Sequence, residues 1–231
     1  MNLLAGINRT RRECGVSGVD FLTVETGLSD EGKRFVDWYN QAWQDVQTAQ
    51  AEWQWMRKGF TFNTVASQQS YTLAQSNATD MAEWLPESFR SYLVSTGVAG
   101  EQYMSFLEYS HFRDTYLFGV ARTQTGNPLW ITYGPDHTLS VWPLPDGIYI
   151  IGGEYYRSPT TLALNADDPA AVGNGLPAKF HMLLVYKAMK SYAAFEAAPE
   201  VYERALAGEK REMNSLIAWG LPMVSMGGAI A

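Results

Sequence analysis

The sequence has very little cysteine: Cys14 is the only one among 231 residues. A single thiol forms no disulfide within the chain, so the fold does not depend on oxidation and suits a reducing compartment. Cys14 has no histidine near it in the sequence. Its position on the inner face of a predicted helix favours a small buried hydrophobe.

Long hydrophobic runs are also lacking. No segment approaches the ~20 apolar residues that a membrane-spanning helix needs, so we expect no membrane partner. The N-terminal stretch MNLLAGINRTRREC has no long apolar run beside its positive charges. We therefore expect neither a signal peptide nor an anchor there.

Basic charge is scarce. The chain has 17 Lys and Arg residues against 24 Asp and Glu, a formal net charge of −7. Because binding to phosphate backbones comes mostly from Lys and Arg, this argues against a protein that grips DNA. The same charge suits a soluble protein, or a surface to which DNA should not adhere. Arg9, Arg11 and Arg12 form the one basic cluster, for which a solvated face or pairing with acids of a neighbouring subunit is favoured over phosphate contact.

Motifs for catalysis and metal binding are missing from the sequence. We find no H-E-x-x-H, C-x-x-C, G-x-S-x-G or P-loop pattern. His111, His137 and His181 each stand alone in their segments, and for His181 a structural role is favoured over that of a ligand. The stretch Asn165–Asp168 lacks the glycine and distal glutamate of a calcium loop, which favours a turn. We therefore expect no enzyme, no cofactor and no metal site.

Aromatic residues are abundant, with 8 Trp, 13 Tyr and 10 Phe. Large aromatic side chains supply core energy and are enriched at protein interfaces. For any single tryptophan a core position is favoured, and an interface comes second.

The strongest periodic signal predicts a long helix that begins at a Ser29 or Asp30 cap and ends at Gly59. About 28 residues at ~1.5 Å each give a rod of roughly 42 Å. Its apolar residues alternate spacings of four and three and form one stripe: Phe35, Tyr39, Ala42, Val46, Ala49, Trp53 and Met56. Trp38, Trp43 and Trp55 lie off this stripe. They predict a second apolar face, covered by the chain itself or by a neighbour.

The rest of the chain predicts an α+β fold: a helical bundle of two N-terminal and two C-terminal helices with an inserted antiparallel β-sheet region. A short helix is expected over residues 2–14, and short strands follow Gly59. The strands close in a hairpin, VWPLPDGIYIIGGEYYRSPTTL, whose Pro-Asp-Gly turn signal is Pro145–Gly147. Helices are expected from Pro177 and Pro199, the second with five residues inward: Tyr202, Ala205, Leu206, Met213 and Leu216. The predicted divisions are residues 1–59, 60–158, 159–218 and an extended tail, 219–231.

Four stretches together resemble the head-to-tail adaptor (connector, or neck) proteins of tailed bacteriophages. They are NRTRRECGVSG, RFVDWYNQAWQDVQ ending in WQWMR, LSVWPLPDGIYIIGGEYYRSPTTL, and LPAKFHMLLVYKAMKSYAAFEAAPEVYERA. The similarity runs from about Leu4 to Leu216 and lies in their order and spacing.

This resemblance implies a structural protein without catalysis. Such adaptors form a ring, usually of twelve copies, beneath the portal protein at the head-tail junction of the virion, and assemble in the host cytoplasm. The ring extends the DNA channel, through which the genome passes without sequence-specific binding, and offers a platform for tail proteins. The helices and C-terminal tail usually contact the portal or sister subunits, and the β-region faces the tail.

These expectations select candidate contact residues. Those expected to contact the portal or a neighbouring subunit are Trp38, Trp43, Trp55, Trp219, Leu221, Pro222, Met223 and Met226. Those expected at a rigid hairpin tip on the tail side are Pro145, Asp146 and Gly147.

Two other readings stay open. A tail or baseplate component could bind a host glycan through exposed Trp and Tyr. A packaging factor could bind DNA through Arg9, Arg11 and Arg12, with affinity that falls steeply as salt rises.

Overall fold

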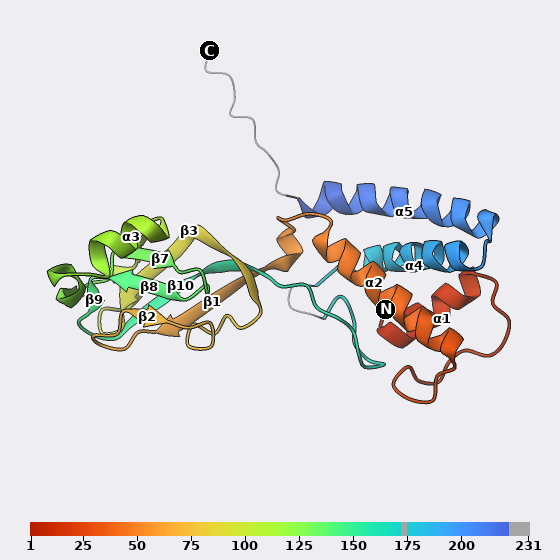
Figure 1. Ribbon diagram of the computed structural model, residues 1–231, viewed down its shortest axis with the longest axis horizontal. Coiled ribbons are helices and arrows are strands. Elements are labelled where there is room, and N and C mark those ends of the chain that lie inside the picture. The colour runs from red at the N-terminus through yellow and green to blue at the C-terminus, as the bar shows by residue number, and fades with distance from the viewer. Residues whose placement is uncertain (172–174, 222–231) are drawn as a thin grey trace, which may run out of the picture. The chain divides into compact units, whose positions relative to one another are not determined.

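The computed structural model describes residues 1–171 and 175–221, which form two compact units (Figure 1). The helical unit holds Met1–Met56 and the described residues from Pro159 onward, and the β unit holds Arg57–Ser158. Helices make up the first unit and mainly antiparallel sheets the second. The predicted α+β fold, with a β region inserted into a helical bundle, is confirmed.

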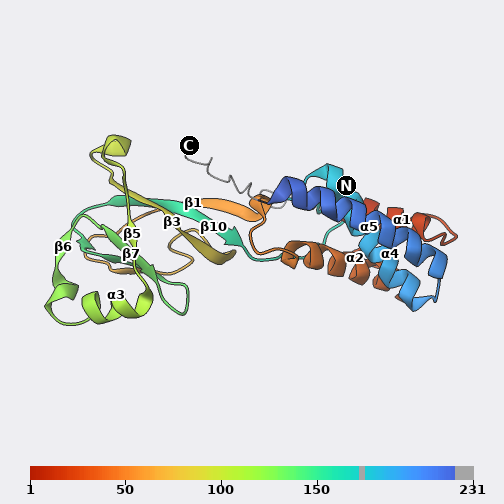
Figure 2. The same cartoon turned by 90° about the horizontal axis from the view of Figure 1, so that it is seen from above.

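The helical unit is built around α4, which contacts α1, α2 and α5 (Figures 1 and 2). Its elements are α1 (Leu3–Glu13), α2 (Asp30–Thr48), the short η1 (Gln54–Met56) and η4 (Ala178–Phe180), α4 (His181–Phe195) and α5 (Pro199–Gly220). Asn2 caps α1 by accepting a hydrogen bond from the amide of Ala5 at 2.9 Å, and Ser29 caps α2 through Gly32 at 3.2 Å. These caps satisfy amides that a helix start leaves unbonded.

The helix predicted to reach Gly59 is shorter: α2 has 19 residues and ends at Thr48. The chain turns after α2, and the indole of Trp53 reaches back and donates to the carbonyl of Val46 at 2.9 Å. A helix end leaves its last carbonyls unbonded, so this bond favours termination there. Gly59 lies inside a strand. Trp53 and Met56 keep the apolar spacing of the helix although they lie beyond its end. They are buried in the segment that follows α2, not on a longer helix.

Helix α5 buries only part of the predicted face. Ala205, Gly208 and Leu216 are buried, whereas Tyr202 and Leu206 are exposed. A Cβ on Gly208 would lie 2.7 Å from the ring of Tyr186, so the absence of a side chain lets α5 approach α4 closely. This close approach fixes which face turns inward. The helix also continues to Gly220, so Trp219 is helical and not part of an extended tail.

The β unit contains two four-stranded sheets and one two-stranded pair. Sheet A has the order β1-β10-β3-β4 and is antiparallel throughout, with β1 (Arg57–Asn63), β3 (Met81–Leu93), β4 (Gln102–Tyr103) and β10 (Tyr149–Arg157). Sheet B has the order β2-β8-β7-β5, with β2 (Ser70–Tyr71), β5 (Ser105–Phe106), β7 (Trp130–Tyr133) and β8 (Leu139–Trp142). The pair is β6 (Thr125–Gly126) with β9 (Leu144–Pro145), and the remaining elements are α3 (Tyr109–Tyr116), η2 (Gly97–Gly100) and η3 (Val120–Thr123).

The predicted hairpin at Val141–Leu162 is wrong. Strand β8 belongs to sheet B and β10 to sheet A, so the two strands do not pair (Figure 1). Pro143 has no amide hydrogen to donate to a ladder, and the chain leaves sheet B there. The turn is also held by its surroundings. Pro145 accepts a backbone bond from Ser67 at 2.8 Å, and Gly147 accepts one from the Thr64 hydroxyl at 3.3 Å. Removing this turn would therefore also remove hydrogen bonds that hold the β unit together.

The core of the β unit comes from the inner faces of its strands. Along β1, Phe60 and Phe62 are buried while Gly59 and Thr61 face outward, as the two-residue period of a strand requires. The buried cluster includes aromatic residues from β1, β2, β3 and β10, namely Phe60, Phe62, Tyr71, Trp84, Phe89 and Tyr155. Their rings lie 4.9–6.3 Å apart, a spacing at which aromatic pairs attract.

Phe89→Ala tests this core. Phe89 is fully buried, so the substitution should lower the free energy of unfolding by about 3–5 kcal/mol. Urea unfolding measures the loss, and hydrogen exchange should locate it in β1, β3 and β10 and not in α4. Val98→Ala, at an exposed position, is the matched control and should cost less than about 0.5 kcal/mol. A loss below about 1 kcal/mol for Phe89→Ala would contradict the assigned core.

Cys14 should be inert in the folded protein. It is buried at the end of α1, and burial raises the pKa of its thiol to about 12. Because the thiolate is the reactive form, a disulfide reagent at pH 8 should label the protein only after urea is added. The variant Ser17→Cys, with a thiol at an exposed position, should react at once. Fast labelling of the native wild-type chain would show that Cys14 is accessible.

Candidate functional site

The polar clusters of the helical unit have structural roles. His181 is buried, and its Nε2 donates to the carbonyl of Leu176 at 3.0 Å; burial lowers the pKa of its imidazole. Asp167 Oδ2 accepts from the amides of Ala163 and Leu164 at 2.7 and 2.8 Å, which makes the predicted turn. Within residues 1–171 and 175–221, no group of three His, Cys, Asp or Glu side chains is placed to hold a metal ion.

The β unit contains a network of ionisable side chains around Asp80, and its hydrogen bonds are made within the chain. Asp80 accepts hydrogen bonds from Tyr155 at 2.6 Å and from the ammonium group of Lys58 at 2.8 Å. Burial alone would raise the pKa of Asp80, but these two donors outweigh it and hold the pKa below its usual value. Asp80 is therefore ionised at neutral pH and stabilises the sheet by pairing.

The basic cluster of α1 is used within the chain. Arg9 pairs with Glu13 at 2.6 Å, and Arg12 pairs with Asp20. Arg11 is buried, donates to the carbonyl of Val19 at 2.9 Å and lies over the ring of Phe21. Acids of the same chain thus pair with Arg9 and Arg12, which disfavours phosphate binding.

The same contacts hold the loop between α1 and α2 in place. Asn8 exchanges two hydrogen bonds with the backbone of Phe21, at 2.8 and 3.0 Å. The aliphatic side chains of Val19 and Leu22 point outward and are 89% and 93% exposed. The loop therefore presents two aliphatic side chains to solvent in a fixed conformation.

The tryptophans expected at interfaces are mostly inside the helical unit. Trp43 and Trp55 are buried and stack on each other at 5.8 Å, so the second apolar face of α2 is covered by its own chain. Trp38 is half-buried against Phe35 and Phe195. Of the eight tryptophans, Trp219 alone is exposed, at 43%; it packs on Phe180. Contacts of these residues with other proteins stay predictions.

The remaining predicted contact residues fall into two groups. Pro222, Met223 and Met226 lie outside the described residues, and Leu221 directly follows α5 and is half-buried. Pro145, the last residue of β9, is buried, and Asp146, directly after it, is exposed. Asp146 accepts a hydrogen bond from the Tyr149 hydroxyl at 2.7 Å. Leu221 belongs to the helical unit, and Pro145 and Asp146 belong to the β unit.

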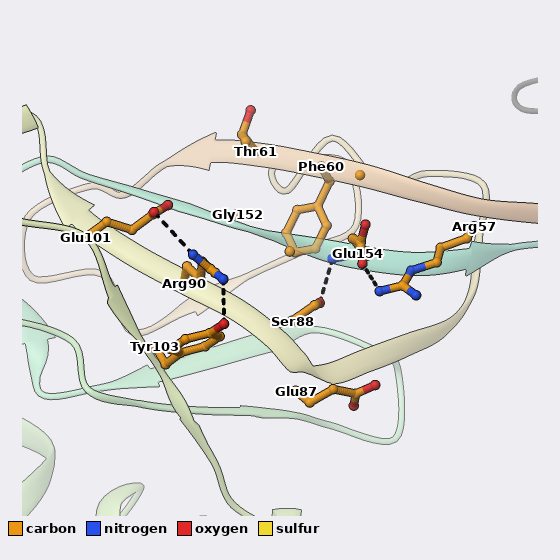
Figure 3. A pocket seen from close by; sticks show the side chains of 12 residues that line it. Arg57, Phe60, Thr61, Glu87, Ser88, Arg90, Glu101, Tyr103, Gly152 and Glu154 are labelled. Carbon is orange, nitrogen blue, oxygen red and sulfur yellow. Dashed lines mark hydrogen bonds and ion pairs between the residues drawn. The ribbon is translucent and has the colours of Figure 1, made fainter. Parts of the chain in front are cut away.

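The β unit has a trough of about 680 Å³ on the outer face of sheet A (Figure 3). Strands β1, β10 and β3 form its floor, and β4 with the preceding Glu101 forms one side. The register shift between Gly152 and Glu154 sets the β3 segment around Glu87 and Ser88 out of regular pairing. This irregularity makes the otherwise flat sheet face concave.

Ion pairs stand at both ends of the trough (Figure 3). Arg57 pairs with Glu154 at one end, and Arg90 pairs with Glu101 at 3.4 Å at the other, where it also lies over the Tyr103 ring. Glu87 lies between the ends and makes no ion pair among the described residues. Three carboxylates and two guanidinium groups thus line the trough, which leaves one net negative charge.

Gly59 keeps the middle of the trough open. Its φ is not left-handed, and a Cβ added there would meet nothing of its own chain closer than the Gly153 carbonyl, at 3.8 Å. Glycine inside a strand costs about 0.5–1 kcal/mol relative to alanine. Because packing does not require it, Gly59 marks a place where another chain or ligand can approach the backbone closely.

A second surface of the β unit is an exposed loop between α3 and β6. Phe118 and Val120 are 61% and 80% exposed, and Arg122 is exposed and makes no ion pair in the part of the chain that the structure describes. Gly119 has a φ of +66°, which turns the chain between the two apolar residues. The carbonyl of Ala121 accepts from the Trp142 indole at 2.9 Å and fixes the loop.

Sequence reasoning missed both the trough and this loop. The single available signal was Gly59 next to FTFN, a glycine within an alternating strand pattern. Apolar residues in a loop, such as Phe118 and Val120, give no periodic signal that separates exposed from buried positions.

The chain also matches a known protein family. The family model described as SU10 adaptor protein matches residues 1–224, nearly the whole chain. No curated protein matches the chain. In the described residues, no helix is both long and apolar enough to cross a membrane. The chain therefore belongs to the SU10 adaptor protein family, a family of phage head-tail adaptors, and the predicted resemblance is confirmed.

Proposed function

We propose that the protein forms a closed ring below the portal, extends the DNA channel and provides a docking platform for the tail. Membership of the adaptor family over residues 1–224 carries this proposal. The exposed apolar surfaces support it, because each unit offers one on a fixed loop: Val19 and Leu22 in one, Phe118 and Val120 in the other. Surfaces of different composition on one chain suit a head-to-tail contact, which makes a ring when it closes.

The partners follow from this role. They are the portal protein, sister subunits, twelve in the usual adaptor ring, and tail proteins. Genomic DNA would pass through the lumen without sequence-specific binding, which the net charge of −7 favours. The structure supports glycan binding less than the sequence does, because seven of the eight tryptophans are buried or half-buried.

The C-terminal segment is the proposed portal anchor. Trp219 is exposed at the end of α5, and the sequence beyond it is apolar: Leu221, Pro222, Met223 and Met226. Trp38 offers additional half-buried aromatic surface. Asp146, in the turn between β9 and β10, is proposed to contact a tail protein.

Mixing the full-length chain with purified portal complexes tests the ring. We expect the chain to sediment with the portal, and class averages from electron microscopy to show a closed ring on one face of it. A chain that stays monomeric and does not sediment with the portal would refute the proposed role. The counted rotational symmetry of the averages tests the number twelve.

Removing Pro222–Ala231 tests the anchor. The deletion leaves α5 and the packing of Trp219 on Phe180 intact, so the circular dichroism and melting temperature should not change. Binding to the portal, measured by sedimentation, should fall at least about 10-fold, because apolar anchor residues carry much of the energy of an interface.

Two full-length variants test whether portal binding depends on the apolar composition of this segment and not on its length alone. Met223→Ser combined with Met226→Ser should also weaken portal binding, whereas Ser225→Ala should leave it unchanged. Undiminished portal binding by the deletion variant would show that the anchor lies elsewhere.

A further inference from the structure

The trough on sheet A is prepared for an occupant that its own chain does not supply. Gly59 leaves space above β1 for which the packing of the β unit gives no reason, since a Cβ there would meet nothing within ordinary contact except the Gly153 carbonyl at 3.8 Å. Ion pairs hold both ends of the trough in place. A pre-formed concave surface with fixed walls is a typical binding site.

The net negative charge of the trough favours an occupant that carries a basic group. Its ion pairs neutralise two of the three carboxylates, and Glu87 is left between them without an ion pair among the described residues (Figure 3). An occupant that combines apolar contact with one positive charge would therefore complement the trough.

The loop between α3 and β6 has this composition. It exposes Phe118 and Val120 for apolar contact and Arg122, without an ion pair in the described chain, two residues further on. The hydrogen bond from the Trp142 indole to the carbonyl of Ala121 fixes the loop, so the loop would lose little conformational freedom on binding. Its anchor, Trp142, belongs to sheet B, whereas the trough lies on sheet A.

We propose that the trough of one copy receives the Phe118–Arg122 loop of a second copy of this chain, with Arg122 paired to Glu87. This inference rests on the proposed ring. Each copy has one loop and one trough, and because the two surfaces differ, the contact runs head to tail and can close around an axis. The complementary charges also set the register of neighbouring copies and disfavour wrong pairings.

Charge reversal tests the contact. Glu87→Arg and Arg122→Glu should each weaken ring formation on the portal at least about 10-fold, because each places like charges opposite each other. A chain with both substitutions restores the pair in reversed sense and should assemble within about 3-fold of wild type. Glu83→Arg, an exposed acid on β3 that does not line the trough, is the matched control and should assemble normally.

Disulfide trapping in assembled rings gives an independent readout. Because Cys14 is buried, Glu87→Cys and Val120→Cys introduce the two reactive thiols. With both substitutions, mild oxidation should produce a ladder of dimers and higher multimers, and each single substitution should produce none. Circular dichroism spectra that match wild type would show that the variants fold.

The outcomes separate this inference from the proposed function. A wild-type chain that never joins the portal refutes the ring and, with it, the contact between copies. Normal assembly of Glu87→Arg and Arg122→Glu, with no ladder from the double cysteine variant, overturns the inference and leaves the ring standing. Loss of tail attachment or glycan binding by Glu87→Arg in an intact ring would assign the trough to that other partner, and would equally overturn it.

Discussion

The burial of α4 is the interaction on which the helical unit depends. Its residues Leu183, Leu184, Ala188 and Met189 are fully buried, and it contacts helices from both ends of the chain. Helices α1 and α2 precede the inserted β unit, whereas α4 and α5 follow it. The apolar surface of α4 is therefore what joins two segments separated by about a hundred residues, since burial of such surface is the main favourable term in folding.

Many of the abundant aromatic residues of the sequence build the cores of the two units. Trp43, Trp53 and Trp55 pack on one another inside the helical unit, and Trp84 lies in the core of the β unit. Trp43, Trp53, Trp55 and Trp84 thus take the core position that the sequence favours for any single tryptophan. The exposed large hydrophobic residues are instead spread over loops, strands and helices, and a few of them, such as Phe118 and Val120, lie on a fixed loop. Contact energy at interfaces is commonly concentrated in such few residues.

Much of the fold could be read from periodicity, because that signal reports burial on one face of an element. It predicted α1, α4 and the insertion of strands after the second helix. It failed where a tertiary contact decides the outcome. Trp53 ends α2 by turning back to Val46, and Gly208 against Tyr186 selects the inner face of α5. Nothing in the local sequence around either residue distinguishes these contacts from a continued helix.

The site was harder to predict than the fold for a related reason. A surface on which proteins assemble needs no sequence motif, because its shape and charge come from residues that lie far apart in the sequence. Gly59, Glu87 and Tyr103 meet only because β1, β3 and β4 join one sheet. That sheet has a further consequence. The chain enters the β unit on β1 and leaves it on β10, and these strands are paired neighbours, with Arg57 opposite Tyr156. An insert whose two ends adjoin can be lengthened, shortened or exchanged during evolution while the connectivity of the helical bundle stays the same, so the surfaces of the β unit and of the helical unit can diversify independently.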